Sequence, residues 1–247
     1  MTTPSTPSTP PIATPSTGPS TAPGPGLVIA VDGTSGSGKS STCRAVAQQL
    51  GLAYLDTGAM FRAMTWWLLH HEVDVHDAAA VATRCAEPTI VSGTDPSAPT
   101  IHVDGIDVAV EIRSDEVTGA VSPVSTVPEV RHRLLVLQRQ VIAAATQGAG
   151  IVVEGRDIGS VVAPEARVKL YLTADPAARA RRRAAEQGGD VAATEASLLS
   201  RDQIDSSRAT APLTMAEGAV HIDTTPYTLD EVVAQVVARA HAVEATT

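Results

Sequence analysis

The chain has very few aromatic residues and almost no cysteine. Of 247 residues only one is phenylalanine, two are tryptophan and three are tyrosine, although 43% are hydrophobic. A chain of this length can bury a sizeable core, which must then consist mainly of aliphatic side chains and alanine. Cys43 and Cys85 are the only cysteines. We expect both to be reduced core thiols and not ligands of a structural metal.

Positive charge and long apolar segments are also scarce. Lysine and arginine together number 18 against 27 acidic residues, so the formal net charge is −9 and the pI is near 5.2. This balance excludes bulk attraction to nucleic acid or an anionic membrane, although a local group of arginines can still bind phosphate. No apolar segment has membrane-spanning length, and the first residues lack a secretory signal pattern. We therefore expect a cytoplasmic protein with no membrane or nucleic-acid partner.

Residues 1–25 have a composition of their own. They are almost wholly threonine, proline, serine, alanine and glycine. Such a segment buries too little apolar surface to offset the entropy that is lost on ordering. The sequence therefore predicts a disordered tail over 1–25 and a folded domain over 26–247.

An unbroken apolar run over 27–31 leads into a glycine-rich segment that reads G-x-x-x-x-G-K-S. This pattern is typical of a phosphate-binding loop, in which backbone N–H groups and a helix N-terminus converge on one anion. Its residues are Gly33, Thr34, Ser35, Gly36, Ser37, Gly38, Lys39 and Ser40, and Ser41 follows. We expect Lys39 to reach the terminal phosphates and Ser40 to ligate Mg²⁺.

The residues on either side favour this interpretation over an ordinary glycine-rich surface loop. A fully apolar run suits a parallel strand that is buried on both faces. After Lys39, apolar residues recur at helical spacing from Cys43 to Leu50, and Gly51 can end that helix. The segment therefore predicts that the protein binds a nucleoside triphosphate.

Strand and helix patterns alternate along the rest of the chain. Apolar runs at 52–55, 151–153, 168–172 and 219–223 predict further strands. Helical patterns begin near Thr57, Pro128, Pro176 and Thr228, and the two threonines can act as N-caps. This alternation predicts an α/β fold of three layers, α/β/α, in which a parallel sheet of about five strands carries helices on both faces.

Residues 88–113 differ in texture from these long elements. Short apolar runs at 89–91, 100–103 and 106–108 are separated by turn residues, among them Asp104-Gly105, a pair typical of tight hairpins. We expect a small antiparallel sheet inserted between helical segments. Further on, residues 122–126, which include Pro123, are expected to form a polar connector before the helix that Pro128 opens.

Arginines recur near strand ends and on helices that could face a cleft. They are Arg62, Arg131, Arg156, Arg179, Arg182, Arg183, Arg201 and Arg208. Each alone is compatible with a solvated surface residue, and Arg201 with Asp205 fits either a surface ion pair or a pair that binds phosphate and sugar hydroxyls. Together they exceed the needs of one triphosphate. They favour a second phosphorylated substrate over nucleic acid in so acidic a chain.

Four motifs follow the phosphate-binding loop in a specific order. They are Asp-Thr-Gly-Ala-Met-Phe-Arg at 56–62, Glu-Gly-Arg-Asp-Ile-Gly at 154–159, Arg-Ala-Arg-Arg-Arg at 179–183 and Arg-Asp-x-x-Asp-x-x-Arg at 201–208. With this order and spacing, the chain resembles bacterial cytidylate kinases over roughly residues 27–240. The resemblance implies a P-loop NTPase core at about 26–56, 131–174 and 191–247. It also implies an acceptor-binding part at about 57–130, with its β insertion at 88–113, and a short arginine-rich lid at about 175–190.

The resemblance further implies a role for each matching residue. Thr57, Arg62, Arg156 and Arg208 would hold the acceptor monophosphate. Ser122, Arg131 and Asp157 would read the cytosine ring, and Arg201 and Asp205 would contact the sugar. Lys39 with Arg179, Arg182 and Arg183 would stabilise the phosphoryl group in transfer, while Asp32 would orient water around Mg²⁺. Two departures are Phe61, where the family often has tyrosine, and the second serine of the loop, Ser41.

The activity implied is transfer of the γ-phosphoryl group of ATP to CMP, and also to dCMP, by a monomer. Two alternatives remain at this stage. One is a kinase of the same architecture for another acceptor, such as UMP, AMP or shikimate. The arginines outside the lid, which we call the second arginine set (Arg62, Arg131, Arg156, Arg201 and Arg208), disfavour a neutral acceptor. The other is a non-catalytic nucleotide-binding module, which would not need a second phosphate site.

Overall fold

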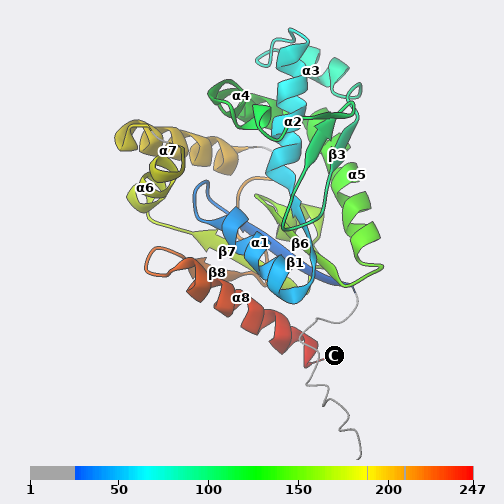
Figure 1. Ribbon diagram of the computed structural model, residues 1–247. Coiled ribbons are helices and arrows are strands. Elements are labelled where there is room, and N and C mark those ends of the chain that lie inside the picture. The colour runs from blue at the N-terminus through cyan, green and yellow to red at the C-terminus, as the bar shows by residue number, and fades with distance from the viewer. Residues whose placement is uncertain (1–25, 188, 209, 247) are drawn as a thin grey trace, which may run out of the picture.

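A five-stranded parallel sheet organises the chain (Figure 1). The computed structural model describes residues 26–187, 189–208 and 210–246, so the tail expected over 1–25 lies outside the described residues. The strands are β1 (Leu27–Gly33), β2 (Ala53–Asp56), β6 (Gly150–Gly155), β7 (Val168–Thr173) and β8 (Val220–Asp223), in the order β2-β6-β1-β7-β8. Every pairing between them is parallel. The predicted sheet is confirmed.

Helices cover both faces of this sheet, because alternate side chains of each central strand enter a different core. Leu27, Ile29 and Val31 of β1 pack with α1 (Lys39–Leu50) and α8 (Leu229–Glu244). Val28 and Ala30 point the other way and join the core built by α2 (Thr57–His70) and α5 (Pro128–Ala145). A strand buried on both faces needs an unbroken apolar run, which the sequence supplies. The three-layer α/β/α fold is confirmed.

Both cysteines lie in these cores. Cys43 packs with the α1–α8 side and Cys85 with the α2–α5 side, and each is a buried free thiol. The expectation that both are buried core thiols is confirmed. No helix among the described residues is both long enough and apolar enough to cross a bilayer.

The segment between β2 and α5 contains the small antiparallel sheet. Its strands are β3 (Ile90–Ser92), β4 (Ile101–Val103) and β5 (Ile106–Asp107), next to α3 (Ala78–Arg84), the 3-10 helix η1 (Glu111–Arg113) and α4 (Asp115–Thr126). Asp104 and Gly105 both have positive φ, 51° and 81°, as the predicted tight hairpin turn requires. The β3–β4 loop reaches back to the main sheet, where the Tyr54 N–H donates to the Thr94 carbonyl at 2.9 Å.

The sequence interpretation of two local features was wrong. Residues 122–126 are the last turn of α4 and not a connector, and Pro123 lies inside the helix. The carbonyls of this last turn accept hydroxyl donors, because Ser125 donates to the Ser122 carbonyl and Thr126 to the Pro123 carbonyl. The N-cap of α2 is Asp56 and not Thr57, since an Asp56 oxygen accepts the Ala59 N–H at 2.9 Å.

Two paired helices, α6 (Pro176–Gln187) and α7 (Val191–Ser207), lie beyond the end of β7 (Figure 1). A single π-helical turn, η2 (Ile158–Val162), follows β6. The carboxyl ends of β1, β2 and β6, the start of α2, the end of α4 and the end of α7 therefore surround one region. In open α/β sheets this is the edge at which ligands bind.

Candidate active site

The glycine-rich loop connects β1 to α1 with the backbone that a phosphate-binding loop needs. Gly33 has a φ of 144°, and a Cβ there would lie 1.9 Å from the Leu172 carbonyl oxygen. Gly38 caps α1 with a left-handed φ of 85°, so α1 begins at Lys39 and its N-terminal N–H groups face the loop. The loop hydroxyls of Thr34 and Ser37 are buried without a hydrogen-bond partner among the described residues.

Lys39 bends back over this loop. Its Nζ donates to the Gly33 carbonyl at 2.9 Å and to the Thr34 carbonyl at 2.6 Å. Burial, and then the nearby Arg156 guanidinium, lower the pKa of Lys39 to about 7. An anion in the loop would favour the charged form of this amine.

Glu154 ends β6 beside the loop, because β6 pairs with β1 and places Glu154 opposite Val31. The Ser40 hydroxyl donates to its Oε2 at 3.1 Å, and the Tyr54 hydroxyl donates to its Oε1. Burial, and then the Asp56 carboxylate, raise the pKa of Glu154, whereas Lys39 and the two hydroxyl donors lower it. Sequence reasoning assigned no role to Glu154. The signal was available, since an acidic residue at the end of an apolar strand is typical of a Mg²⁺ site next to such a loop.

One pocket, which we call the acceptor pocket, opens in front of the loop. All nine residues that were expected to bind the acceptor line it: Thr57, Arg62, Ser122, Arg131, Arg156, Asp157, Arg201, Asp205 and Arg208. They come from α2, α4, α5, the turn after β6 and the end of α7. Lys39, Ser40 and Arg183 line the same pocket from the donor side. The fold thus places the triphosphate loop and the second arginine set in one cavity.

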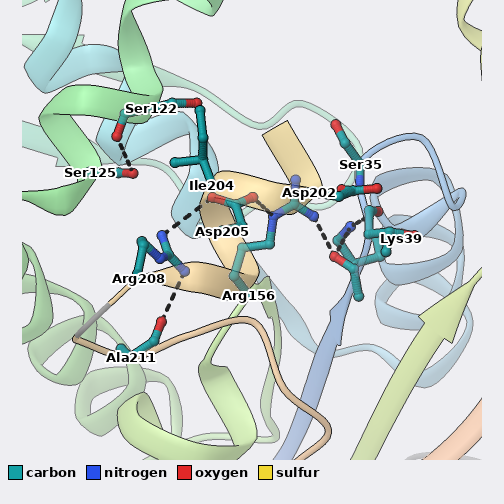
Figure 2. Close-up of polar contacts among 12 residues, drawn as sticks. Ser35, Lys39, Ser122, Ser125, Arg156, Asp202, Ile204, Asp205, Arg208 and Ala211 are labelled. Atoms are coloured by element: carbon teal, nitrogen blue, oxygen red, sulfur yellow. Dashed lines mark hydrogen bonds and ion pairs between the residues drawn. The ribbon is translucent and has the colours of Figure 1, made fainter. Parts of the chain in front are cut away.

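Asp205 joins two of these arginines across the pocket (Figure 2). Its Oδ2 accepts Arg156 Nε at 2.8 Å, and its Oδ1 lies 3.5 Å from Arg208 Nη1. Arg156 also donates to the Gly33 carbonyl, and Arg208 donates to the Ala211 carbonyl at 3.0 Å. These contacts fix both guanidinium groups, as a preorganised anion site requires.

Two further arginines are paired in the same way. Arg62 Nη2 contacts Asp56 Oδ2 at 3.0 Å. Arg62 is therefore paired with the carboxylate of the N-cap residue of its own helix, α2. Arg131 forms a buried pair with Asp157 and donates to the Ser125 carbonyl at 3.1 Å. The sequence was compatible with a solvated arginine at this position, but the Arg131 side chain is buried and paired.

Donor groups without a partner remain in the pocket. Within the described residues, the Nε–H groups of Arg62 and Arg208 are buried and donate to no acceptor. Burial, and then the Arg156 guanidinium, lower the pKa of Arg201 to about 10, whereas the Asp205 carboxylate opposes this effect. Burial also lowers the pKa of Arg208. An excess of buried cationic donors of this kind suits an anionic ligand.

The lid arginines divide into two groups. Arg183 lines the acceptor pocket. Arg179 is buried against the loop, where its Nη1 donates to the Ser35 carbonyl at 2.9 Å and to Asp202. Arg182 donates to the Thr224 carbonyl at 2.9 Å, away from the pocket lining. The structure therefore does not gather all three around Lys39.

Several pocket residues were missed by the sequence analysis. Arg113, Thr118 and Ser125 line the acceptor pocket, and Asp202 accepts the Ser35 N–H at 3.2 Å. Asp202 lies within the quoted Arg-Asp motif, but the other three had no pattern to distinguish them from surface residues. Phe61 also lines the pocket, and the Arg131 guanidinium lies 5.4 Å from the centre of its ring.

Comparison with known proteins agrees with this geometry. The family model for cytidylate kinase matches residues 29–242. A cytidylate kinase from Streptomyces avermitilis is 55% identical over 214 residues, which cover 86% of this chain and 92% of the relative. One from Streptomyces griseus is 56% identical over 212 residues, covering 85% and 91%. One from Nocardia farcinica is 50% identical over 212 residues, covering 84% and 90%. By sequence, motifs and pocket, the chain belongs to the cytidylate kinase family.

Proposed function

We propose that this protein transfers the γ-phosphoryl group of ATP to CMP, and also to dCMP, to form CDP or dCDP and ADP. The observation that carries the proposal is the shared cavity in which Lys39 and Ser40 of the loop face the whole second arginine set. The acceptor oxygen belongs to a phosphate that is already deprotonated near neutral pH, so the reaction needs no separate general base. Positioning and charge stabilisation then supply most of the catalysis.

The donor phosphates bind in the 33–41 loop, with Lys39 on the β- and γ-phosphates. Mg²⁺ fits beside this loop, because the Ser40 hydroxyl and the Glu154 carboxylate converge at 3.1 Å and are the hard oxygen ligands that this ion prefers. Held there by Ser40 and Glu154, Mg²⁺ would help to neutralise the negative charge that develops on the phosphates during transfer. Asp32 is a weaker candidate, because both of its carboxylate oxygens already accept backbone N–H groups.

The acceptor phosphate binds between Thr57, Arg62, Arg156 and Arg208. The unpartnered Nε atoms of Arg62 and Arg208 support this assignment. A phosphate here would also draw Arg156 and Arg208 away from Asp205. Asp205 is then free, with Arg201, to accept and donate to the sugar hydroxyls.

The cytosine ring binds further in, against Ser122, Arg131 and Asp157. Asp157 is an acceptor and suits the exocyclic amine of cytosine, while Arg131 suits the ring carbonyl and nitrogen. The buried pair between the two holds both groups in position before the base arrives. An acceptor with a carbonyl in place of the amine would face the Asp157 carboxylate, which disfavours UMP.

The phosphoryl group in transfer is stabilised by Lys39 and Arg183, which line the cavity, together with Arg179 and Arg182. Arg179 and Arg182 must exchange their present protein partners for nucleotide oxygens as the lid over 175–190 closes. Closure against the acceptor-binding part over 57–130 would exclude water and prevent hydrolysis of ATP. The core over 26–56, 131–174 and 191–247 stays fixed in this scheme.

One chain supplies every residue that we assign to the two substrate sites, so we propose that the protein acts as a monomer. We also propose that it is cytoplasmic and acts on small nucleotides and not on nucleic acid. Sedimentation of the purified protein, with and without both nucleotides, tests the monomer. A concentration-dependent dimer would contradict it.

An assay of ADP release across CMP, dCMP, UMP, AMP and shikimate tests the reaction. We expect CMP and dCMP to give the highest kcat/KM by at least about tenfold, and the Lys39→Ala enzyme to lose most turnover. A higher kcat/KM with UMP, AMP or shikimate would show that this compound, and not CMP, is the acceptor. Full turnover by Lys39→Ala would contradict the mechanism.

A further inference from the structure

Asp32 makes two contacts that the reaction scheme does not use. It lies at the end of β1 and is only 2% exposed. Its Oδ1 accepts the Ile158 N–H at 2.7 Å, and its Oδ2 accepts the Gly159 N–H at 2.8 Å. Ile158 lies 126 residues away along the chain. Both donors belong to the turn that directly follows Arg156 and Asp157.

This contact satisfies the start of a helical turn from another strand. Ile158 and Gly159 are the first residues of η2, whose N–H groups have no acceptor within the turn. The N-cap residue of η2, Asp157, makes no side-chain cap hydrogen bond. Asp157 is engaged instead with Arg131. Asp32 supplies the missing cap, and its carboxylate accepts both donors at once.

A third contact attaches the same turn to β1. Arg156 donates to the Gly33 carbonyl, next to Asp32. The strands are in register here, because Asp32 pairs with Gly155. Arg156 and Asp157 thus lie between the strand pairing on one side and the two Asp32 hydrogen bonds on the other. Their side chains line the acceptor pocket, whereas Asp32 does not.

We propose that Asp32 is a positioning residue for the acceptor: it caps η2 so that Arg156 and Asp157 face the CMP phosphate and base. This role replaces the orientation of water around Mg²⁺ that the sequence suggested. It rests on the proposed CMP kinase activity. The burial of Asp32 agrees with it, because each carboxylate oxygen accepts a backbone N–H and the side chain does not line the acceptor pocket.

The test is the Asp32→Asn variant, which keeps the shape of the side chain. The amide oxygen can accept one N–H, but the amide nitrogen opposes the other, so the turn loses one of its two attachments. We expect the KM for CMP to rise about tenfold or more, since displacement of a binding group by a fraction of an ångström is enough for such a loss. The KM for ATP and the Mg²⁺ concentration for half-maximal activity should stay within about twofold.

A binding measurement separates this role from general destabilisation. CMP alone should raise the melting temperature of Asp32→Asn much less than that of the unsubstituted protein, while ATP alone should raise both equally. Glu165→Gln, which removes an exposed carboxylate, is the matched control. It should change neither the melting-temperature shift caused by CMP nor the one caused by ATP. A shifted Mg²⁺ dependence with an unchanged KM for CMP would overturn the proposal, and so would equal losses for CMP and ATP.

If Asp32→Asn is not recovered folded, hydrogen exchange in the unsubstituted protein carries the test. The amides of Ile158 and Gly159 should exchange slowly, and CMP should slow them further where ATP does not. Exchange as fast as in an exposed turn would overturn the proposal. Failure of the proposed function is distinguishable, because it would appear as absent CMP turnover in the unsubstituted enzyme.

Discussion

Arginine–carboxylate pairs dominate the acceptor pocket at the residue scale. Asp56, Asp157 and Asp205 each hold at least one guanidinium before any substrate is present. A buried arginine without a partner is costly, so the pairs keep these cations in place while the site is empty. A nucleotide phosphate then competes with a carboxylate for donors that are already oriented. The arrangement favours a ligand with more charge than one carboxylate, which distinguishes a monophosphate from a neutral metabolite.

The Glu154→Gln variant tests the Mg²⁺ side of the site. Glutamine keeps the size of the side chain, but it removes the charge that makes Glu154 a ligand for a hard cation. We expect the Mg²⁺ concentration for half-maximal activity to rise about tenfold or more, with little change in the KM for CMP. A Mg²⁺ titration at saturating nucleotides measures this.

Tyr54→Phe is the control for that experiment, since it removes one hydroxyl donor to Glu154 and keeps the carboxylate. Its Mg²⁺ dependence should shift less than that of Glu154→Gln. An unchanged Mg²⁺ dependence in Glu154→Gln would remove Glu154 from the metal site.

The buried Asp32 predicts a pH dependence of stability. Burial raises its pKa from the ordinary 3.8 to about 6. Between these values the folded chain keeps a proton that the unfolded chain has lost, so the free energy of unfolding falls as pH rises and is constant above about 6. At about 1.4 kcal/mol per pKa unit, the loss is about 3 kcal/mol.

The asparagine side chain of the Asp32→Asn variant does not titrate. The contributions of all other titrating groups to the pH dependence therefore cancel when the two proteins are compared. From about pH 4 to about pH 7, the unsubstituted protein should lose about 2.4 kcal/mol of unfolding free energy relative to Asp32→Asn, since part of the effect is already lost at pH 4. Urea unfolding at both pH values measures the difference. A difference that does not vary with pH would show that the pKa of Asp32 is not raised.

Helix ends supply most of the site at the element scale. The start of α1 holds the loop, the start of α2 carries Thr57 and Arg62, and the end of α7 carries Arg201, Asp205 and Arg208. Arg208 is already the C-cap of α7, so the last turn of this helix sets the geometry of the Asp205 network. Rigid helix ends hold functional groups more closely than free loops do.

The start of α8, by contrast, contributes no residue to the lining of the acceptor pocket. Thr228 and Glu231 form a capping box there, with the Thr228 Oγ1 accepting the Glu231 N–H at 3.3 Å. We expect Thr228→Ala to lower the free energy of unfolding by about 1 kcal/mol and to leave kcat and both KM values unchanged. Thr228→Ser is the matched control and should keep most of the stability. A loss of activity at a temperature where Thr228→Ala is folded would contradict this separation.

The whole molecule contains two cores that share one sheet. The α1–α8 core supports the phosphate-binding loop, while the α2–α5 core extends from the main sheet to the small antiparallel sheet. The β3–β4 loop returns to the edge strand β2, where Thr94 accepts the Tyr54 N–H and Pro96 accepts Arg44 Nε at 3.0 Å. The small antiparallel sheet is thus attached to the donor side at its far end as well as through α2.

All residues proposed for the two substrate sites lie after residue 25, so removal of residues 1–24 should not affect the reaction. We expect kcat, both KM values and the melting temperature of a chain that begins at Pro25 to match those of the full chain. A large loss of turnover on truncation would show that the tail contributes to the site.

Much of the fold follows from local patterns. The apolar run of β1, the loop glycines, the helical spacing in α1 and the Asp104–Gly105 turn each depend on neighbours in sequence, and each prediction is confirmed.

Local reasoning was wrong where two local rules compete. Pro123 breaks most helices, but buried residues before and after it hold α4 together. Asp56 and Thr57 can both cap, and the Thr57 hydroxyl is taken by the Glu154 carbonyl at 2.7 Å.

The sequence alone determined that the protein has a phosphate-binding loop, because the loop residues follow one another at 33–40. It also showed more arginines than one triphosphate needs, although these are spread over residues 62–208. The family resemblance also predicted nine acceptor residues, and the fold brings all nine into one pocket. Only the tertiary structure decided the partner of each charge. Ser40 meets Glu154 and Asp32 meets Ile158 because parallel strands bring residues more than 110 positions apart to one sheet edge. Such contacts depend on strand order and register, for which one sequence carries no local signal.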